Sequence, residues 1–306
     1  MALRCYRKSL LWTIPDLSAW ALCKRVAGSV LNHNLTGYSA QLAYYFFLSL
    51  FPSLLFLTTL LAFLPIHHRT EMILNILGHA LPKQALLLVK GNLEGIVHQH
   101  KSGLLSFSVL FALYSASNAI MAISAGLNHA YGVAEERPYW RVLLMAILLV
   151  LGLVLVLTIA FAIFFFGPHL ATLIAKQFGL RLWPATLTII RWPILLFALV
   201  LATAIIYYFT PNVHQKWHWL TPGSAFAITG WIGTSLLLAF YVNHFGSYNR
   251  TYGSIGVVII LLTWMYLGGL MLLIGGEINS ALKRLREDTC KKSESSTEKR
   301  GCKPSH

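Results

Sequence analysis

Charged side chains are scarce in this sequence, and acidic ones are scarcer still. Of its 306 residues, 11% are charged and only 10 are Asp or Glu, whereas 57% are hydrophobic. Soluble domains carry about 25% charged and roughly 45–50% apolar residues. Because so few charges cannot cover a water-exposed surface, the composition excludes a disordered chain and an ordinary soluble enzyme. With a mean hydropathy of +0.64, it indicates a polytopic membrane protein.

Cysteine is also rare, and its placement excludes a disulfide scaffold. The four cysteines are Cys5, Cys23, Cys290 and Cys302, and none has the close spacing of a zinc or redox site. All four fall on the side predicted below to be cytoplasmic, where thiols stay reduced. We expect unpaired thiols, no metal site and no cofactor.

Acidic residues are absent from the interiors of all the long apolar runs, and Glu277 lies just beyond the last one. Ion-coupled carriers usually depend on buried carboxylates or histidine relays, so this absence weakens such a mechanism. Two histidine pairs, His67–His68 and His98–His100, flank the first outer loop. They could bind zinc, but without a Cys or Asp ligand the pattern favours histidines at the membrane interface.

Long uncharged runs are what the chain has in abundance. A helix needs about 20 apolar residues to cross the hydrocarbon core, and six stretches qualify. They cover residues 42–64, 104–126, 142–166, 188–209, 223–242 and 254–275. We therefore predict an all-α polytopic membrane protein with six transmembrane helices and with both termini on one side.

The basic residues predict which side that is. Of the 24 Lys and Arg, 16 fall on the side of the termini and eight on the other, which favours cytoplasmic N and C termini. In a soluble protein a net charge of +14 would suggest nucleic acid. Here the excess is spread over both membrane surfaces, so it indicates topology and headgroup contact. We expect membrane lipids as partners and no nucleic acid.

The chain divides into three predicted parts. Residues 1–38 form a cytoplasmic segment with an amphipathic interfacial helix near 17–33, because apolar residues recur there at helical spacing. Residues 39–285 form the six-span domain, and 286–306 a disordered basic cytoplasmic tail without apolar periodicity. The outer loop, 66–101, carries two amphipathic helical patterns and is predicted to cap the outer mouth of the bundle.

Weakly polar residues form stripes on the second span. Ser117, Ser124 and Asn128 share one helix face, and Ser108, Ser115 and Asn118 form a neighbouring stripe. They line a cavity or, as the pattern favours, make interhelical hydrogen bonds of about 0.6 kcal/mol per pair.

Small residues and prolines mark where helices pack or bend. Glycine pairs suited to close helix packing are Gly268 with Gly275, Gly269 with Gly276, and Gly230 with Gly233. Pro52 in the first span and Pro193 near the start of the fourth are expected to bend or break those helices.

Four ordered blocks of residues carry a resemblance. They are 39–52 (SAQLAYYFFLSLFP), 114–118 with 126–132 and 137–138, 207–212 with 222–223, and 252–256 with 264–266 and 275–279. Together they resemble the YihY/BrkB family of bacterial inner-membrane proteins, over about residues 17–285. The resemblance implies a six-span, multi-pass protein of the bacterial inner membrane. It implies no established reaction: the family's older name, ribonuclease BN, is regarded as an error, and some relatives are linked to serum resistance or envelope lipid transport.

The leading hypothesis is a non-enzymatic protein that moves or accommodates a lipid-like or lipid-linked envelope amphiphile. The alternatives are a structural or assembly factor of the envelope and, more remotely, a ribonuclease, for which the sequence offers no acid–base constellation. No catalytic residue is assigned, and the oligomeric state stays open. The candidate ligand-cavity residues are Tyr44, Tyr45, Ser49, Pro52, Asn118, Asn128, Arg191, Tyr252, Glu277 and Asn279.

Overall fold

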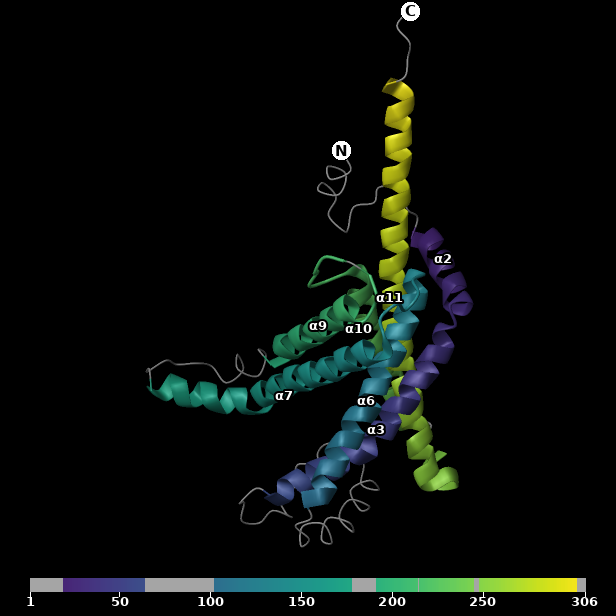
Figure 1. The fold of residues 1–306 in the computed structure, drawn as a ribbon. Helices are drawn as coiled ribbons and strands as arrows, with labels where there is room; N and C mark the ends of the chain where they lie inside the picture. Colours follow the sequence, from purple (N-terminus) through teal and green to yellow (C-terminus); the bar gives the residue numbers. More distant parts are fainter. Residues whose placement is uncertain (1–18, 64–101, 178–190, 214, 245–247, 302–306) are drawn as a thin grey trace, which may run out of the picture.

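The computed structural model describes residues 19–63, 102–177, 191–213, 215–244 and 248–301 (Figure 1). Within these ranges all regular structure is helical, which confirms the predicted all-α class. The helices are α2 (Ala19–Asn32), α3 (Leu35–Phe63), α6 (Ser102–Tyr131), α7 (Tyr139–Gln177), α9 (Arg191–Phe209), α10 (Pro222–His244) and α11 (Tyr248–Gly301). The predicted outer loop, with its helical patterns and histidines, lies outside the described residues.

Five described helices are long and apolar enough to cross a membrane, so the chain is a polytopic membrane protein. Their apolar segments are Ser106–Tyr131, Tyr139–Phe164, Arg191–Phe209, Pro222–Val242 and Gly256–Leu285, which match the second to sixth predicted spans. The first predicted span falls in α3, a 29-residue helix without a charged residue, and its predicted end lies outside the described residues. The count of six and the orientation stay predictions.

Helix α6 lies at the centre of the bundle because small and branched apolar side chains give it a surface that three neighbours can approach. It packs against α3, α7 and α11 (Figure 1), and its Ile123 and Leu127 are almost completely buried. They meet Leu42 of α3 and Leu273 of α11 in one apolar core. Helices α7, α9 and α10 instead expose many large apolar side chains, as surfaces facing lipid do.

The predicted glycine packing is found on α11. A methyl group at Gly268 would contact Trp231, at Gly269 Leu42, at Gly275 the carbonyl oxygen of Gly223, and at Gly276 Leu127. On α10, Gly230 packs against Met271, whereas Gly233 has nothing within 4 Å among the described atoms. The smaller glycine face predicted on α10 is therefore made by Gly230 alone.

The two prolines occupy different places in their helices, and neither breaks one. Pro52 is buried inside α3, which continues without a break to Phe63. Pro193 lies in the first turn of α9, where its missing N–H has no partner within the helix in any case. It therefore begins that helix instead of bending it.

The two ends of the described chain lie at the same end of the bundle. Helix α2 forms within the segment predicted to be helical and packs beside α11 (Figure 1). Helix α11 is 54 residues long, about 80 Å, so it extends well past an apolar core of about 30 Å. Its continuation to Gly301 departs from the predicted disordered tail, because Glu, Lys and Arg readily extend a helix that is already nucleated.

Candidate functional site at one end of the bundle

Helix α6 ends in a left-handed glycine turn. Gly132 has a φ of 68°, its N–H donates to the carbonyl of His129 at 3.0 Å, and the N–H of Val133 donates to the carbonyl of Asn128 at 3.0 Å. This cap needs glycine because a Cβ is strained at positive φ. It turns the connector 132–138 back across the end of α6.

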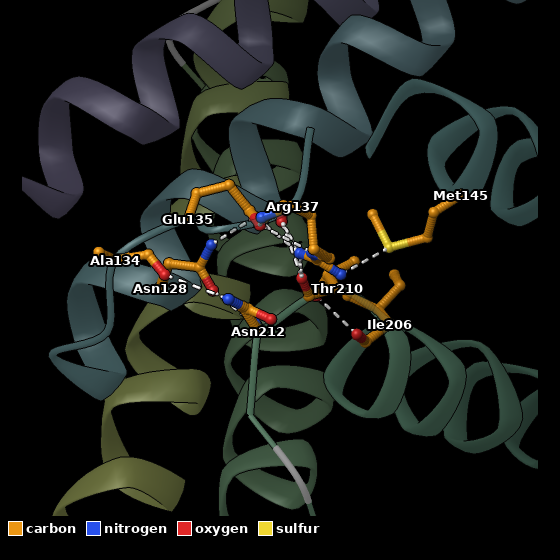
Figure 2. Close-up of polar contacts among 9 residues, drawn as sticks. Asn128, Ala134, Glu135, Arg137, Met145, Ile206, Thr210 and Asn212 are labelled. Carbon is orange, nitrogen blue, oxygen red and sulfur yellow. Dashed lines mark hydrogen bonds and ion pairs between the residues drawn. The ribbon is translucent and has the colours of Figure 1, made fainter. Parts of the chain in front are cut away.

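Arg137 of that connector joins four parts of the molecule, as Figure 2 shows. Its Nε and Nη2 each donate to a carboxylate oxygen of Glu135 at 2.7 Å. Nη2 also donates to the carbonyl of Thr210 at 2.9 Å and to Oγ of Ser124 at 3.3 Å. Nη1 lies 3.4 Å from Sδ of Met145. One guanidinium group thus holds the connector against α6, α7 and the end of α9.

Asn128 uses both ends of its amide in the same cluster. It is 4% exposed, its Nδ2 donates to Oε2 of Glu135 at 2.9 Å, and its Oδ1 accepts the backbone N–H of Asn212 at 2.7 Å. Asn212 in turn donates through Nδ2 to the carbonyl of Ala134 at 3.2 Å (Figure 2). The α6–α7 and α9–α10 connectors are therefore locked together over the end of α6.

A cavity of about 300 Å³ lies at this cluster. Its lining residues are Met121, Ser124, Ala125, Asn128, Glu135, Arg137, Tyr139 and Val142. The lining combines polar and charged side chains with apolar ones. An opening of this kind suits a molecule that carries both a polar group and a hydrocarbon part.

The Glu135 carboxylate at this cavity is stabilised in its charged form. Hydrogen bonds from the Arg137 side chain hold the pKa of Glu135 below its ordinary value, although partial burial acts in the opposite direction. The two side chains are 24% and 31% exposed, so they form a half-buried ion pair that a polar ligand can reach. Among the described residues, no three His, Cys, Asp or Glu side chains gather to hold a metal ion.

A second polar contact lies where α2 turns into α3. Asn34 adopts a left-handed φ of 51°, which asparagine tolerates better than most residues, and the turn presents His33 to α11. Nδ1 of His33 lies 3.0 Å from Oε2 of Glu277, whose residue is only 1% exposed. This pair fixes the α2–α3 corner to α11.

The carboxyl end of α6 receives further donors from α11. Ser280 Oγ and Arg284 Nη2 each donate to the carbonyl of Ala130 at 2.7 Å. The last carbonyls of a helix have no partner within it and carry partial negative charge. A hydroxyl group and a cation therefore suit this position, and they join α6 to α11.

The start of α10 is held by the same stretch of α11. Asn279 Oδ1 accepts the N–H of Gly223 at 2.9 Å, and its Nδ2 donates to Oγ1 of Thr221 at 3.0 Å. Thr221 caps the helix, because its Oγ1 accepts the N–H of Ser224 at 3.1 Å while Ser224 Oγ accepts the N–H of Thr221 at 2.8 Å. Asn279 thus positions a capped helix end.

Of the ten candidate residues, Asn128, Glu277 and Asn279 gather at this end of the bundle. Tyr252 belongs to α11, but its side chain lies outside the described ones. It is 25 residues before Glu277 on one helix, a separation of about 37 Å. The ten residues therefore do not line one cavity.

The remaining candidates lie along other helices. Tyr44 is 58% exposed, and its ring centroid lies 5.5 Å from that of Tyr45. Ser49 and Asn118 donate to backbone carbonyls of their own helices, and Pro52 is buried. At the start of α9, the Arg191 guanidinium lies 5.4 Å from the centre of the Phe164 ring.

The second-span stripe fills the predicted roles only in part. Ser117 donates to the carbonyl of Leu113 in its own helix at 2.6 Å. Ser124 instead crosses to the carbonyl of Thr210 at 2.7 Å, and both Ser124 and Asn128 line the cavity.

Sequence reasoning did not select Glu135, Arg137, Thr210 and Asn212 as site residues. Glu135 and Arg137 looked like ordinary loop charges that report topology. The available signal was an acid and a base two residues apart, in a short connector bounded by Gly132 and Pro138. In such a short connector near an apolar surface, Glu135 and Arg137 have few partners other than each other.

The fold and this polar end define a multi-pass, all-helical membrane protein. Over residues 26–300 the chain matches the family described as virulence factor BrkB. The chain therefore belongs to the BrkB family, as the sequence blocks predict.

Three relatives illustrate how far the similarity extends. "Putative ribonuclease-like protein YfkH" of Bacillus subtilis is 38% identical over 254 residues, which cover 81% of this chain and 90% of that protein. A "UPF0761 membrane protein" of Pseudoalteromonas atlantica is 25% identical over 272 residues, or 83% and 84% of the two chains. One from Nitrosospira multiformis is 27% identical over 265 residues, or 83% and 59%. No solved structure matches the chain.

Proposed function

We propose that this membrane protein accommodates a lipid-like amphiphile at the cavity beside Arg137 and carries its headgroup across the bilayer without chemical change. The observation that carries the proposal is the mixed lining of that cavity at the end of a membrane helix. The lining includes the Glu135–Arg137 pair and Asn128 as well as Met121 and Val142. A headgroup suits the polar and charged residues, and the start of an acyl chain suits the apolar ones.

The surroundings of the cavity support an amphiphile over a water-soluble ligand. Tyr139 and Trp140 at the start of α7 are 64% and 60% exposed, and aromatic residues of this kind favour the membrane–water interface. Along α7 the exposed face continues through Leu144, Leu148 and Leu151. A hydrocarbon chain leaving the cavity therefore has an apolar surface to follow.

The proposal includes the topology and the membrane. Six spans with cytoplasmic termini in the bacterial inner membrane fit the excess of Lys and Arg on the side of the termini. His33 and Glu277 are in contact, so both lie at the same end of the bundle. An even number of membrane spans between these two residues fits that contact. The polar end then faces the cytoplasm, and the amphiphile enters from the inner leaflet.

Filling the cavity tests the proposal. Ala125→Leu adds three carbon atoms to a cavity-lining position, whereas Val154→Leu enlarges an exposed residue of α7. Both variants and the wild type are reconstituted into liposomes that contain fluorescent phospholipid, and lipid movement is followed by dithionite quenching. We expect Ala125→Leu to slow movement at least several-fold and Val154→Leu to match the wild type. Equal rates for all three, or no movement above protein-free liposomes, would overturn the proposal.

A structural or assembly role is the second candidate, because many polar side chains of the described helices bond to other parts of the protein. Ser280 and Tyr207, for example, each donate to a carbonyl of another helix. This role predicts that substitutions change abundance or complex formation equally, whether or not they reach the cavity. Pull-down and abundance measurements on the same two variants separate the two functions.

A ribonuclease is the remote alternative, and it rests on the name of one relative. Neither that name nor those of the UPF0761 relatives establishes a reaction. Incubating the purified protein, freed of soluble nucleases, with tRNA precursors tests it. We expect no cleavage above that of a mock purification.

A further inference from the structure

The connector between α9 and α10 has an unusual composition for a loop. Residues 215–220 read Gln-Lys-Trp-His-Trp-Leu, so that two tryptophans alternate with a basic residue and a histidine. Solvated loops are generally rich in small polar residues and turn formers. Two large amphipathic rings in six residues therefore call for a separate explanation.

The connector folds back along α9 instead of extending into solvent. Gln215 Nε2 donates to the carbonyl of Tyr207, which reverses the chain direction just beyond the helix. The Trp217 ring then lies 5.1 Å from that of Tyr208, edge-on. The return path runs beside α9 in Figure 1.

The aromatic contacts continue along the connector. The Trp219 ring lies 5.6 Å from that of Trp217 and 6.3 Å from that of Phe197, nearly parallel to the latter at 27°. Phe197 precedes Phe209, the last residue of α9, by 12 residues, a rise of about 18 Å. The connector rings therefore cover the side of α9 over a large part of its length.

These rings do not form a protein core. Trp219 and Phe197 are each 56% exposed, Phe209 is 48% and Leu220 is 44%. The exposed apolar surface continues along α9 to Leu196 and Trp192, which are 50% and 67% exposed. Lys216 and His218 are also exposed. The patch thus joins the lipid-facing side of α9 and carries polar groups within it.

A second exposed aromatic pair lies at the same end of the molecule. Tyr139 and Trp140 begin α7, and the Arg141 guanidinium lies 5.1 Å from the centre of the Trp140 ring. The contacts of Arg137 and Asn128 with the α9–α10 connector place both aromatic groups at this end. Aromatic side chains beside basic ones are characteristic of the boundary between headgroups and acyl chains.

We infer that residues 215–220 form a membrane-interface anchor, in which Trp217 lies at the boundary between lipid headgroups and acyl chains and Trp219 extends from it along α9 toward the acyl chains. Lys216 and His218 face the headgroups. The occupant of this patch is the bilayer itself, because the patch is continuous with the apolar face of α9. The anchor fixes the depth of the α9 end, and with it the depth of the cavity beside Arg137.

Spin-label depth measurement tests the inference. The four native cysteines are replaced by serine, and a nitroxide is attached at Leu220→Cys in the full-length protein in liposomes. Glu136→Cys, on the exposed α6–α7 connector, serves as the aqueous reference, and Leu237→Cys, 68% exposed on α10, as the lipid reference. Size-exclusion profiles establish that each labelled protein is folded.

We expect the label at 220 to have an immersion depth between the two references. A label that is as accessible to a water-soluble nickel chelate as the one at 136 would overturn the inference. So would a label shielded from both the chelate and oxygen, because a second copy or another protein would then cover the patch. As a second readout, shallowly brominated lipids should quench wild-type fluorescence more than that of Trp219→Phe, and equal quenching would also count against the anchor.

Discussion

Arg137 contacts four parts of the molecule through a single guanidinium group. Its partners are the Glu135 carboxylate, the Thr210 carbonyl, the Ser124 hydroxyl and the Met145 sulfur. The ion pair itself is half exposed, and pairs of this kind contribute only about 0–1 kcal/mol. Most of the stabilisation from Arg137 therefore comes from the charged hydrogen bonds that join the connector to Ser124 of α6 and to Thr210 at the end of α9.

Removing this guanidinium should destabilise the fold more than removing the charge of Glu135. Because hydrogen bonds to charged groups contribute about 1.5–3 kcal/mol, we expect Arg137→Ala to lower the free energy of unfolding by about that amount. Glu135→Gln, which keeps an acceptor oxygen, should lower it by less than about 1 kcal/mol. Unfolding by SDS titration measures both, with Arg141→Ala as the control. Equal effects of Arg137→Ala and Arg141→Ala would contradict this role.

Protonation of Glu135 should make the stability of the protein depend on pH. Hydrogen bonds from Arg137 hold its pKa in the folded protein below the ordinary value of 4.5. A carboxyl group whose pKa is lower in the folded protein than in the unfolded chain stabilises the fold at any pH above its unfolded-state pKa. This stabilisation is lost as the pH falls through the folded-state pKa. The difference in unfolding midpoint between wild type and Glu135→Gln should therefore be constant above about pH 5.5 and shrink as the pH falls below the ordinary pKa. If the difference in unfolding midpoint grew as the pH was lowered, the pKa of Glu135 would be raised in the folded protein, which would contradict the assigned direction.

At the level of elements, helices α10 and α11 approach closely at two glycines. A Cβ at Gly223 would overlap the backbone oxygen of Gly275, and a Cβ at Gly275 would overlap the oxygen of Gly223 and the hydroxyl of Tyr207. Backbone atoms cannot turn aside as the end of a side chain can. This contact therefore requires the absence of a side chain on both helices.

Alanine at either position should separate the helices. Overpacking costs about 1–3 kcal/mol, so we expect Gly223→Ala and Gly275→Ala to lower the thermal unfolding midpoint in detergent clearly. Gly233→Ala is the matched control, because no neighbouring atom in the described part of the chain lies within 4 Å of a Cβ at that position and alanine favours a helix by about 0.5–1 kcal/mol over glycine. The control should leave the midpoint unchanged or raise it. If Gly233→Ala lowered the unfolding midpoint as much as Gly275→Ala does, the close-contact explanation would be contradicted.

The helices could be predicted from the sequence because a long apolar run is a local property that the membrane makes decisive. The site could not, since it depends on which connectors meet. Asn128 could be selected as a polar residue on a span, but its partner Asn212 is 84 residues away. Gly230 and Gly233 share one sequence pattern, yet only Gly230 faces Met271. The helical extension to Gly301 has no apolar period of its own, because it continues a helix already formed.

On the scale of the whole molecule, polar contacts gather at one end of the bundle and apolar exposure dominates the outer helices. The Arg137 cluster ties α6, α7 and α9 together at this end. The His33–Glu277 contact and the Asn279 contacts tie α2, α10 and α11 together. This end is predicted to face the cytoplasm, where the basic residues are concentrated.

The four native cysteines report this orientation directly. We expect a membrane-impermeant maleimide to label the protein in inverted membrane vesicles and to leave it unlabelled in intact bacterial cells. The reason is that all four positions fall on the predicted cytoplasmic side. Denatured protein serves as the control for full reactivity. Labelling in intact cells would reverse the orientation.

The most direct test of the central claim, that the cavity beside Arg137 holds a lipid-like amphiphile, is native mass spectrometry of the purified protein after extensive detergent washing. The account predicts that wild type and Val154→Leu each retain one amphiphile, and that Ala125→Leu, in which the cavity is filled, retains none. Equal retention by all three proteins, or no retained molecule on the wild type, would contradict it.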